Sequence, residues 1–313
     1  MKRGKWIGAA LAGLVLAVLA CASGVLPKIE EKPAPEPAPE IVAAQPEPVE
    51  EKPFSTDGLE PGFTRVDGAF YFVQEDGTLL RESGCHTLGD TRVFCEGESA
   101  VLQILSHQVE LSDGRRFLVE GGEIVRSMGL KDFYGNLYFL KPDFSLLCDG
   151  SWKGMRFGAD GVYTCGNAEI DDFINAIVRE VTEPSMNREE KLRACYEYVF
   201  EHTDYQSNNR HVARGAAASS WTEEYMLRLI ERGKGNCYCY AAEMYYLAKR
   251  VGYYNARAIS GGVMLDNDHG WLEIEVNGEP TVTDPELESK NFSTSGHIFL
   301  TPYDDTPWDY FVD

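Results

Sequence analysis

The pattern of hydrophobic and polar positions divides residues 54–313 into a strand-rich part and a part that contains helices. Residues 54–166 hold short aromatic and aliphatic runs separated by Asp-Gly turns, a pattern typical of serial β-hairpins. After residue 167, apolar residues recur at steps of three and four, which predicts helices over 170–181, 222–232 and 237–250, and another that starts at Asn187 with a capping box to Glu190. Strands are predicted from Ala256 onward.

The strand-rich part contains an internal repeat. Five phenylalanines recur at steps of 22, 23, 22 and 18 residues: Phe72, Phe94, Phe117, Phe139 and Phe157. The best internal match pairs residues 62–80 with residues 129–147 at a constant offset of 67. Hairpins of fixed short period are expected to stack and share a core.

The N-terminus predicts export. The first five residues carry three basic side chains, and residues 6–26 are uncharged, which is typical of a secretory signal and is also long enough to span a bilayer. The run Val18-Leu19-Ala20-Cys21 resembles a bacterial lipoprotein box, in which Cys21 would carry the lipid. Both alternatives, lipoprotein anchor and transmembrane helix, put the rest of the chain outside the cytoplasm, at the cell surface.

The segment that follows is predicted to be a spacer. Residues 27–53 hold eight of the fifteen prolines, interleaved with Glu and Ala, and cannot bury a core. In polyproline geometry they would reach about 80 Å. The expected domains are a signal peptide or anchor at 1–26, a linker at 27–53, a β-hairpin repeat region at 54–166 and a catalytic domain at 167–313.

The charge of the chain limits its partners. The net charge is −21. This argues against nucleic acid and against a polybasic hold on anionic lipid, so membrane contact is expected through the N-terminal anchor only. A solvated acidic surface is the simplest reason for the excess of Asp and Glu.

Three residues in the C-terminal part suggest nucleophilic catalysis. Cys237 begins a predicted helix, His269 begins a strand, and Asp284 closes the next strand. An Asn277-Gly278 turn between the two strands predicts a hairpin in which residue 276 faces 279. That register makes the Asp284 carboxylate a diagonal neighbour of the His269 ring. A cysteine nucleophile needs such a base and a group that orients it.

The start of the helix favours a reactive thiol. Asn236 is a suitable N-cap, and Gly252 follows the last helical turn. A thiol in the first turn lies at the positive end of the helix dipole, which favours the thiolate. The free backbone N–H groups there could also hold an oxyanion.

At these residues the chain resembles the transglutaminase-like domains of the papain superfamily. Gly235-Asn236-Cys237 resembles their nucleophile region, His269-Gly270-Trp271 their His-Ala-Trp strand, and Asp284-Pro285 their Asp-Pro. The similarity covers about residues 167–313, and Cys239 departs from the small residue often found there. The resemblance implies an α+β fold in which the Cys helix packs on an antiparallel sheet that carries His and Asp.

The resemblance also implies a mechanism, and we expect it to need no cofactor or metal in this chain. Cys237 would attack a peptide or carboxamide carbonyl, with His269 as base and then acid, and Asp284 orienting the ring. The thioester would pass to water or to an amine, and the motif does not decide which. Our own expectation is hydrolysis first and transamidation second. A second oxyanion donor is expected upstream of Cys237, and Gln206 and Trp221 are the candidates.

Metal binding is a further alternative for these residues. Cys237, Cys239, His269 and Asp284 could in principle form a four-ligand zinc site, but helix positions two apart point to different faces. The acidic loop Asp266-Asn267-Asp268 lacks the pattern of a calcium hand. Cys195 and Cys239 are more simply read as small buried side chains.

The repeats resemble the cell-wall-binding hairpins of Gram-positive surface proteins. Such repeats place tryptophans around a ligand, and here only Trp152 occupies such a place. The resemblance implies binding of wall glycan or choline, while a purely structural stalk remains the alternative. Export permits disulfides, of which the most local connectivity is Cys85 to Cys95 and Cys148 to Cys165.

The sequence therefore predicts an anchored surface protein whose C-terminal domain performs cysteine-dependent acyl transfer on a peptide or protein substrate at the cell surface. The alternative is a catalytically silent adhesion or wall-binding module in which the three residues serve only packing.

Overall fold

A computed structural model describes residues 55–97, 99–207, 211–264, 267–288 and 298–312. The proposed signal segment, Cys21 and the proline-rich linker lie outside these residues. Within the described ranges, no helix is both long and apolar enough to cross a membrane.

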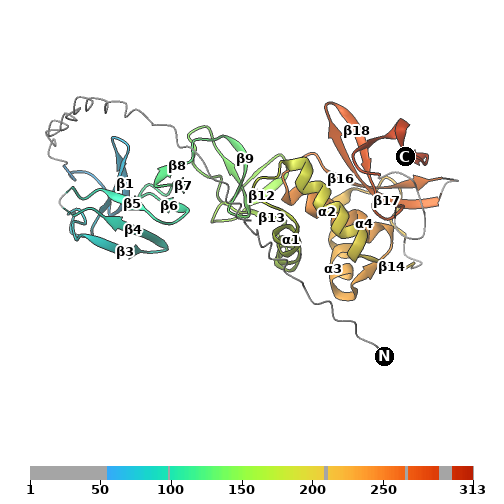
Figure 1. Ribbon diagram of the computed structural model, residues 1–313, viewed down its shortest axis with the longest axis horizontal. Helices are drawn as coiled ribbons and strands as arrows, with labels where there is room; N and C mark the ends of the chain where they lie inside the picture. The colour runs from blue at the N-terminus through green and yellow to red at the C-terminus, as the bar shows by residue number, and fades with distance from the viewer. Residues whose placement is uncertain (1–54, 98, 208–210, 265–266, 289–297, 313) are drawn as a thin grey trace, which may run out of the picture. The chain divides into compact units, whose positions relative to one another are not determined.

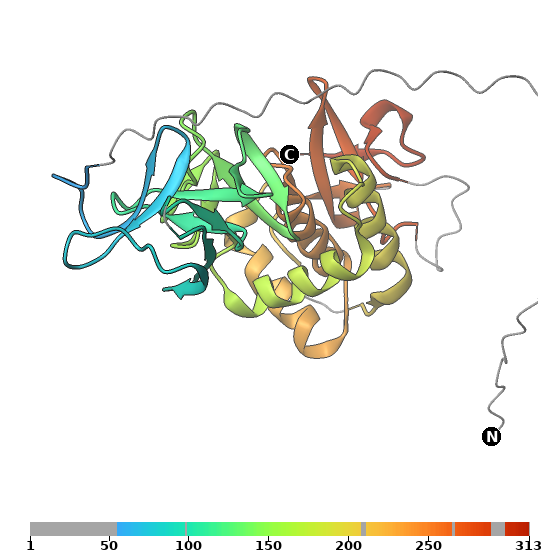
Figure 2. The ribbon, with the colours of Figure 1, turned by 60° about the vertical axis from the view of Figure 1, so that its left-hand side comes forward.

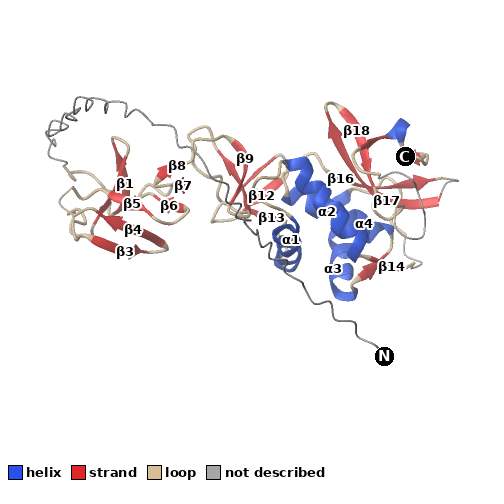
Figure 3. Ribbon diagram, in the orientation of Figure 1, coloured by secondary structure: helices blue, strands red, loops and turns tan. Residues whose placement is uncertain are grey.

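The first part of the described chain is built from hairpins, as expected (Figure 1, Figure 3). Five strands form one antiparallel sheet in the order β1-β2-β5-β4-β3, and the remaining strands form smaller sheets. The strands are β1 Gly62–Val66, β2 Ala69–Val73, β3 Gly84–Leu88, β4 Thr91–Cys95, β5 Leu102–Ile104, β6 Gln108–Glu110, β7 Arg116–Glu120, β8 Glu123–Ile124, β9 Gly129–Phe133, β10 Asn136–Leu140, β11 Gly150–Trp152, β12 Met155–Phe157 and β13 Tyr163–Thr164.

The internal repeat predicted from the sequence is visible in the backbone. Hairpin β1-β2 and hairpin β9-β10 have equal strand lengths, and every strand boundary of the second lies 67 residues after that of the first. Each hairpin is followed by a single bridge at the same offset, Val73 with Leu79 and Leu140 with Leu146. The sequence offset therefore corresponds to a repeated structural unit.

One turn geometry recurs four times in this part. An Asp side chain accepts a hydrogen bond from the backbone N–H two residues later, at 2.9–3.2 Å. Two backbone hydrogen bonds close each turn around that side chain. The aspartates are Asp76, Asp113, Asp143 and Asp160. An Asp that bonds its own backbone in this way fixes the turn locally, so each hairpin is specified largely by its own residues.

The second part places helices before a sheet. The helices are α1 Ala168–Val181, α2 Arg188–His202, α3 Thr222–Arg232 and α4 Cys237–Arg250, with short 3₁₀ turns η1 Ala218–Ser220 and η2 Tyr303–Asp305. The strands are β14 Asp204–Tyr205, β15 Lys234–Gly235, β16 Arg257–Val263, β17 Asn267–Val276, β18 Glu279–Thr283, β19 Thr301–Pro302 and β20 Tyr310–Phe311.

Helix α4 is the centre of this part. It contacts α1, α2 and α3 as well as strands β16 and β17, and these helices lie together in both views (Figure 1, Figure 2). Almost every one of its residues is buried, and its buried apolar residues belong to the largest apolar cluster of the described residues. The predicted bounds of α3 and α4 are correct, and the predicted capping box of Asn187 with Glu190 is present.

The sheet beside α4 is antiparallel, in the order β19-β18-β17-β16-β20. Its central hairpin has the predicted register, with Val276 opposite Glu279 and Leu272 opposite Thr283. Asn277 and Gly278 both have positive φ, 54° and 86°, as a type I′ turn requires. The fold class is thus a β-hairpin region followed by an α+β domain.

No disulfide joins the described cysteines, all seven of which are free. The Cys85–Cys95 pairing suggested from the sequence is wrong because the two side chains leave opposite faces of the β3-β4 hairpin. Cys85 is opposite Phe94, and its side chain is exposed, whereas Cys95 is buried. The Cys148–Cys165 pairing is also absent. The Cys165 thiol instead hydrogen-bonds to the carbonyl of Asn167 at 3.5 Å.

Candidate functional site

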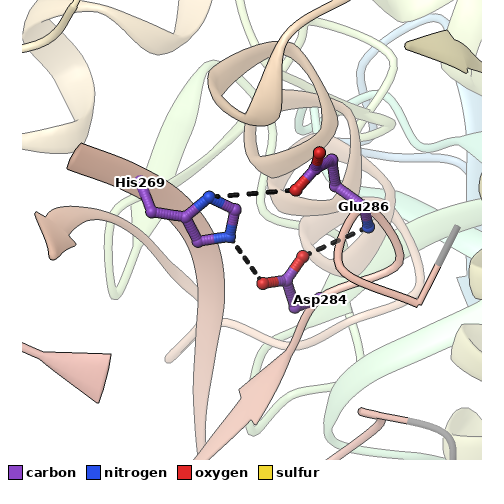
Figure 4. A group of neighbouring side chains, drawn as sticks. All are labelled: His269, Asp284 and Glu286. Carbon is purple, nitrogen blue, oxygen red and sulfur yellow. Dashed lines mark hydrogen bonds and ion pairs between the residues drawn. The ribbon is translucent and has the colours of Figure 1, made fainter. Parts of the chain in front are cut away.

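His269 and Asp284 are joined directly, as the hairpin register predicts. His269 lies in β17, and Asp284 follows the last residue of β18. The distance from Nε2 of His269 to Oδ2 of Asp284 is 2.7 Å (Figure 4). Both side chains are at least nine-tenths buried. A carboxylate held this close to one ring nitrogen fixes the orientation of the imidazole.

Asp284 is itself held on both oxygens. Its Oδ2 also accepts a hydrogen bond from the hydroxyl of Tyr310 at 2.8 Å. Its Oδ1 accepts from the backbone N–H groups of Glu286 at 3.1 Å and Leu287 at 3.2 Å. Four donors therefore surround this buried carboxylate, which is what a buried charge requires.

Cys237 is hydrogen-bonded to the same ring. It is the first residue of α4 and is 9% exposed. Burial by itself would lower the pKa of His269, but the charges of Asp284 and Cys237, together with hydrogen bonds to both side chains, raise that pKa well above its ordinary value. The structure thus brings the three predicted residues together around one imidazole, with conditions that favour a protonated ring.

The contact between α4 and β17 depends on a glycine. A Cβ atom at Gly270 would lie 2.7 Å from the ring of Tyr238 and 3.3 Å from its Cα. Tyr238 is the neighbour of Cys237, and Gly270 is the neighbour of His269. The tyrosine ring therefore fills the space of a side chain at position 270, and this close approach sets the separation of the helix start from the histidine strand.

The start of α4 leaves donors near the sulfur. The carbonyl of Asn236 accepts from the N–H of Cys239 at 2.8 Å and of Tyr240 at 3.2 Å. Asn236 occupies the N-cap position, but its side chain makes no capping hydrogen bond. The N–H groups of Cys237 and Tyr238 have no acceptor within the helix, as in any first turn.

Cys239 lies apart from this group. Its side chain packs against the backbone of Gly235, where a Cβ atom would collide with it, and burial raises the pKa of its thiol to about 12. The group of described residues that could hold a metal is His269, Asp284 and Glu286, and it contains neither cysteine. The four-ligand zinc site considered from the sequence is therefore not formed. Asp284 is also occupied by its four donors.

The acidic loop before His269 has protein partners. Asp266 lies outside the described residues. Asp268 accepts a hydrogen bond from Nε of Arg214 at 2.7 Å and lies 3.5 Å from Nδ1 of His211. Arg214 and His211 thus contact the two carboxylate oxygens of Asp268, which are the atoms that a calcium ion would bind.

The two oxyanion candidates lie in different environments. Trp221 is buried at the N-cap position of α3, and its ring packs edge-on against Tyr238, the residue after Cys237. Within the described residues its indole N–H has no hydrogen-bond acceptor. Gln206 has an exposed side chain, and its backbone N–H donates to the carbonyl of Gly235 at 2.8 Å. Both candidates remain predictions, and Trp221 is the one with an unused donor.

Two residues that contact the histidine–aspartate pair were missed from the sequence. Tyr310 reaches Asp284 from β20, which pairs with β16 at the edge of the sheet. Glu286 places a carboxylate oxygen 3.9 Å from Nδ1 of His269. No local pattern marks Tyr310, since it follows Asp284 by 26 residues, whereas the acid at position 286 is visible in the run Asp284-Pro285-Glu286.

Comparison with protein families agrees with the geometry. Residues 175–285 match the family described as the transglutaminase-like superfamily. This part of the chain is a transglutaminase-like domain. The match ends one residue after Asp284, so Glu286 and Tyr310 lie beyond it. No curated protein matches the chain.

Several solved structures share a limited likeness with the chain. Choline binding protein F from Streptococcus pneumoniae, in the presence of a peptidoglycan analogue, is 15% identical over 34% of this chain and 33% of its own, with a TM-score of 0.19. The modular autolysin LytC from the same organism is 10% identical over 31% of this chain and 26% of its own, with a TM-score of 0.15. This chain spans about a third of the length of choline binding protein F.

The aromatic candidate in the repeats, Trp152, has a cation beside it. Its ring stacks on Phe139 with centroids 4.7 Å apart and meets Tyr254 edge-on at 5.1 Å. The ammonium of Lys153 lies 5.0 Å from the Trp152 ring and 4.0 Å from the Tyr254 ring. Two aromatic rings, those of Trp152 and Tyr254, therefore already contact a cation that the chain itself supplies.

Proposed function

We propose that the transglutaminase-like domain is a cysteine-dependent acyltransferase that acts on peptide or carboxamide bonds, with Cys237 as nucleophile, His269 as general base and acid, and Asp284 as the residue that orients the ring. Hydrolysis is the favoured outcome and transamidation the second. The observation that carries the proposal is the meeting of three side chains: Nε2 of His269 lies 2.7 Å from Asp284, and the Cys237 side chain is hydrogen-bonded to the same ring, contacts that raise the pKa of His269.

The mechanism follows from these positions. The sulfur of Cys237 attacks the carbonyl carbon, and the oxyanion forms near the N–H groups of the first turn of α4. The imidazolium of His269 gives its proton to the leaving amine as the C–N bond breaks. Neutral His269 then takes a proton from water, whose hydroxyl displaces the sulfur and releases the acid.

A labelling experiment tests the nucleophile. A thiol-directed acylating probe should react with the wild-type ectodomain at Cys237, and Cys237→Ala should abolish this reaction. The matched control is Cys239→Ala, two residues along the same helix, which should keep the wild-type rate because burial holds that thiol protonated. His269→Ala should lower labelling sharply at neutral pH. Equal labelling of all four proteins would instead favour the catalytically silent module.

A second experiment separates the two reactions of the thioester. Added primary amines should divert part of the acyl group into stable amides if the enzyme transfers to amines. If the acid is the sole product at every amine concentration, the transamidation branch is excluded and hydrolysis remains.

We also propose that the domain works at the cell surface. The basic N-terminus, the uncharged segment 6–26 and the proline-rich linker support export and anchoring. Cell fractionation tests this: the wild-type chain should be found with the membrane, and Cys21→Ser should release it if a lipid is the anchor. Retention of this variant in the membrane would point to a transmembrane helix.

The repeats are the basis of a second candidate function, binding of choline or wall glycan. The rings of Trp152 and Tyr254 beside Lys153 favour a cationic ligand. Calorimetry with choline should detect binding that Trp152→Ala removes and that Lys153→Ala strengthens, since the lysine competes for the rings. Absence of binding in both wild type and Lys153→Ala would leave the repeats as a structural stalk.

A further inference from the structure

A second carboxylate lies beside His269, on the ring nitrogen that Asp284 does not use. Oε2 of Glu286 is 3.9 Å from Nδ1, whereas Asp284 is bonded to Nε2 (Figure 4). The same turn produces both contacts, because the backbone N–H of Glu286 donates to Oδ1 of Asp284. The turn after β18 therefore puts one acid on each side of the imidazole.

Glu286 is enclosed by titratable groups from several elements. It is 4% exposed. Burial raises the pKa of its carboxyl to about 7; the charge of Asp284 adds to the rise, and His269 opposes it. The groups that face this site are His269 from β17, Asp284 after β18, Tyr205 from β14, Cys237 and Tyr240 from α4, and Tyr310 from β20.

The reaction changes the charge on this side of the ring. In the free enzyme of the proposed mechanism, the sulfur of Cys237 carries a negative charge and the ring of His269 a positive one. When the sulfur has bonded to the carbonyl carbon in the tetrahedral intermediate, the negative charge has moved from the sulfur to the oxyanion, and the imidazolium still has to hold its proton until the leaving amine takes it. At this stage Glu286 still places a carboxylate oxygen 3.9 Å from Nδ1 of His269.

We propose that Glu286 is a positioning residue that acts through His269. Its carboxylate keeps the ring protonated and directed at the sulfur of Cys237. This inference rests on the proposed function of the triad. The proton balance is unchanged: Nδ1 gives one proton to the leaving amine and later recovers one from water, while Glu286 forms and breaks no covalent bond.

The sign of the effect can be worked out. A carboxylate close to the ring favours the imidazolium, so replacing it by an amide should let the ring lose its proton at lower pH. Glu286 is protonated and uncharged at acid pH, so the replacement should change little there. The expected signature is therefore confined to the alkaline side of the pH profile.

The experiment measures the rate of labelling by the acylating probe from pH 5 to pH 10 on the full ectodomain. Glu286→Gln should move the alkaline limb about one to two pH units lower, and its profile should coincide with that of wild type below about pH 6. Glu286→Asp retains the charge and should restore part of the shift.

Glu243→Gln is the matched control. Glu243 is 1% exposed, burial raises its pKa to about 7, and it bonds to the hydroxyl of Thr203 rather than to the triad. This variant should keep the wild-type alkaline limb. An unshifted limb in Glu286→Gln, or a loss of equal size at every pH, would overturn the inference. A wild-type protein that the probe does not label would instead refute the proposed function itself.

Discussion

The hairpin region and the transglutaminase-like domain differ in where they keep polar groups. Among the described residues, the buried polar side chains of the hairpins are Thr91 and Ser145, both neutral. Within these same described residues, every buried charged side chain lies after residue 190: Lys191, Glu243, Lys249, Arg250, His269, Glu273, Asp284, Glu286 and Glu288. Burying a charge is costly unless partners compensate it. The core of the second region therefore contains charged side chains that need partners, whereas the buried polar side chains of the hairpins are neutral.

The two regions also differ in how their contacts are distributed along the sequence. Each aspartate turn of the hairpins joins residues within four positions of one another. The triad joins α4, β17 and the end of β18, and Tyr310 adds a fourth segment. Changes in the first region should affect one hairpin, whereas changes in the second should affect chemistry without removing the fold.

The largest expected effect comes from Asp284→Asn. The amide keeps the shape of the side chain but no longer carries the charge that favours the imidazolium, and we expect labelling at Cys237 to fall about 10³-fold. Circular dichroism should show an unchanged fold. A variant that labels at the wild-type rate would remove Asp284 from the proposed mechanism.

The next effect concerns stability and pH. The pKa of Glu243 is about 7 in the folded protein and 4.5 in an ordinary exposed site, so the folded state binds this proton more tightly. Its contribution to stability is present below about pH 4.5 and is lost as pH rises through 7. Glu243→Gln should remove this loss, which amounts to about 3 kcal/mol at most. Urea unfolding at pH 5 and pH 8 measures it, and equal pH dependence in both proteins would contradict it.

The oxyanion candidates give a smaller effect on rate. Trp221→Phe keeps a large aromatic ring against Tyr238 but removes the indole N–H, and we expect acylation to slow about 10²-fold. Gln206→Ala is the companion variant, because it removes the other candidate at an exposed position. If Gln206→Ala slows the reaction and Trp221→Phe does not, the assignment is reversed.

The smallest effect belongs to the hairpins. Asp143→Ala removes the side-chain acceptor of one turn, including the hydrogen bonds from the N–H and hydroxyl of Ser145. We expect a loss of about 1 kcal/mol in the free energy of unfolding and no change in the rate of labelling at Cys237. A large change in that rate would show that the two regions are coupled more strongly than their contacts suggest.

The sequence predicted the local features well. The bounds of α4, the register of the Asn277-Gly278 hairpin and the repeat offset of 67 were all readable because each depends on neighbours in the chain. Tyr310 was not readable, because it reaches Asp284 only once β20 has paired with β16. The suggested Cys85–Cys95 disulfide failed because the register of the β3-β4 hairpin pairs Cys85 with Phe94 and leaves Cys95 on the other face.

The protonation of His269 tests the central claim most directly. Nuclear magnetic resonance of the ring nitrogens over a pH titration should show an imidazolium that persists well above the ordinary pKa of 6.5. Cys237→Ala should lower that pKa, because the charge of Cys237 and its hydrogen bond to the ring both raise the pKa of His269. A ring that titrates near 6.5 in the wild type, and is unaffected by Cys237→Ala, would contradict the account.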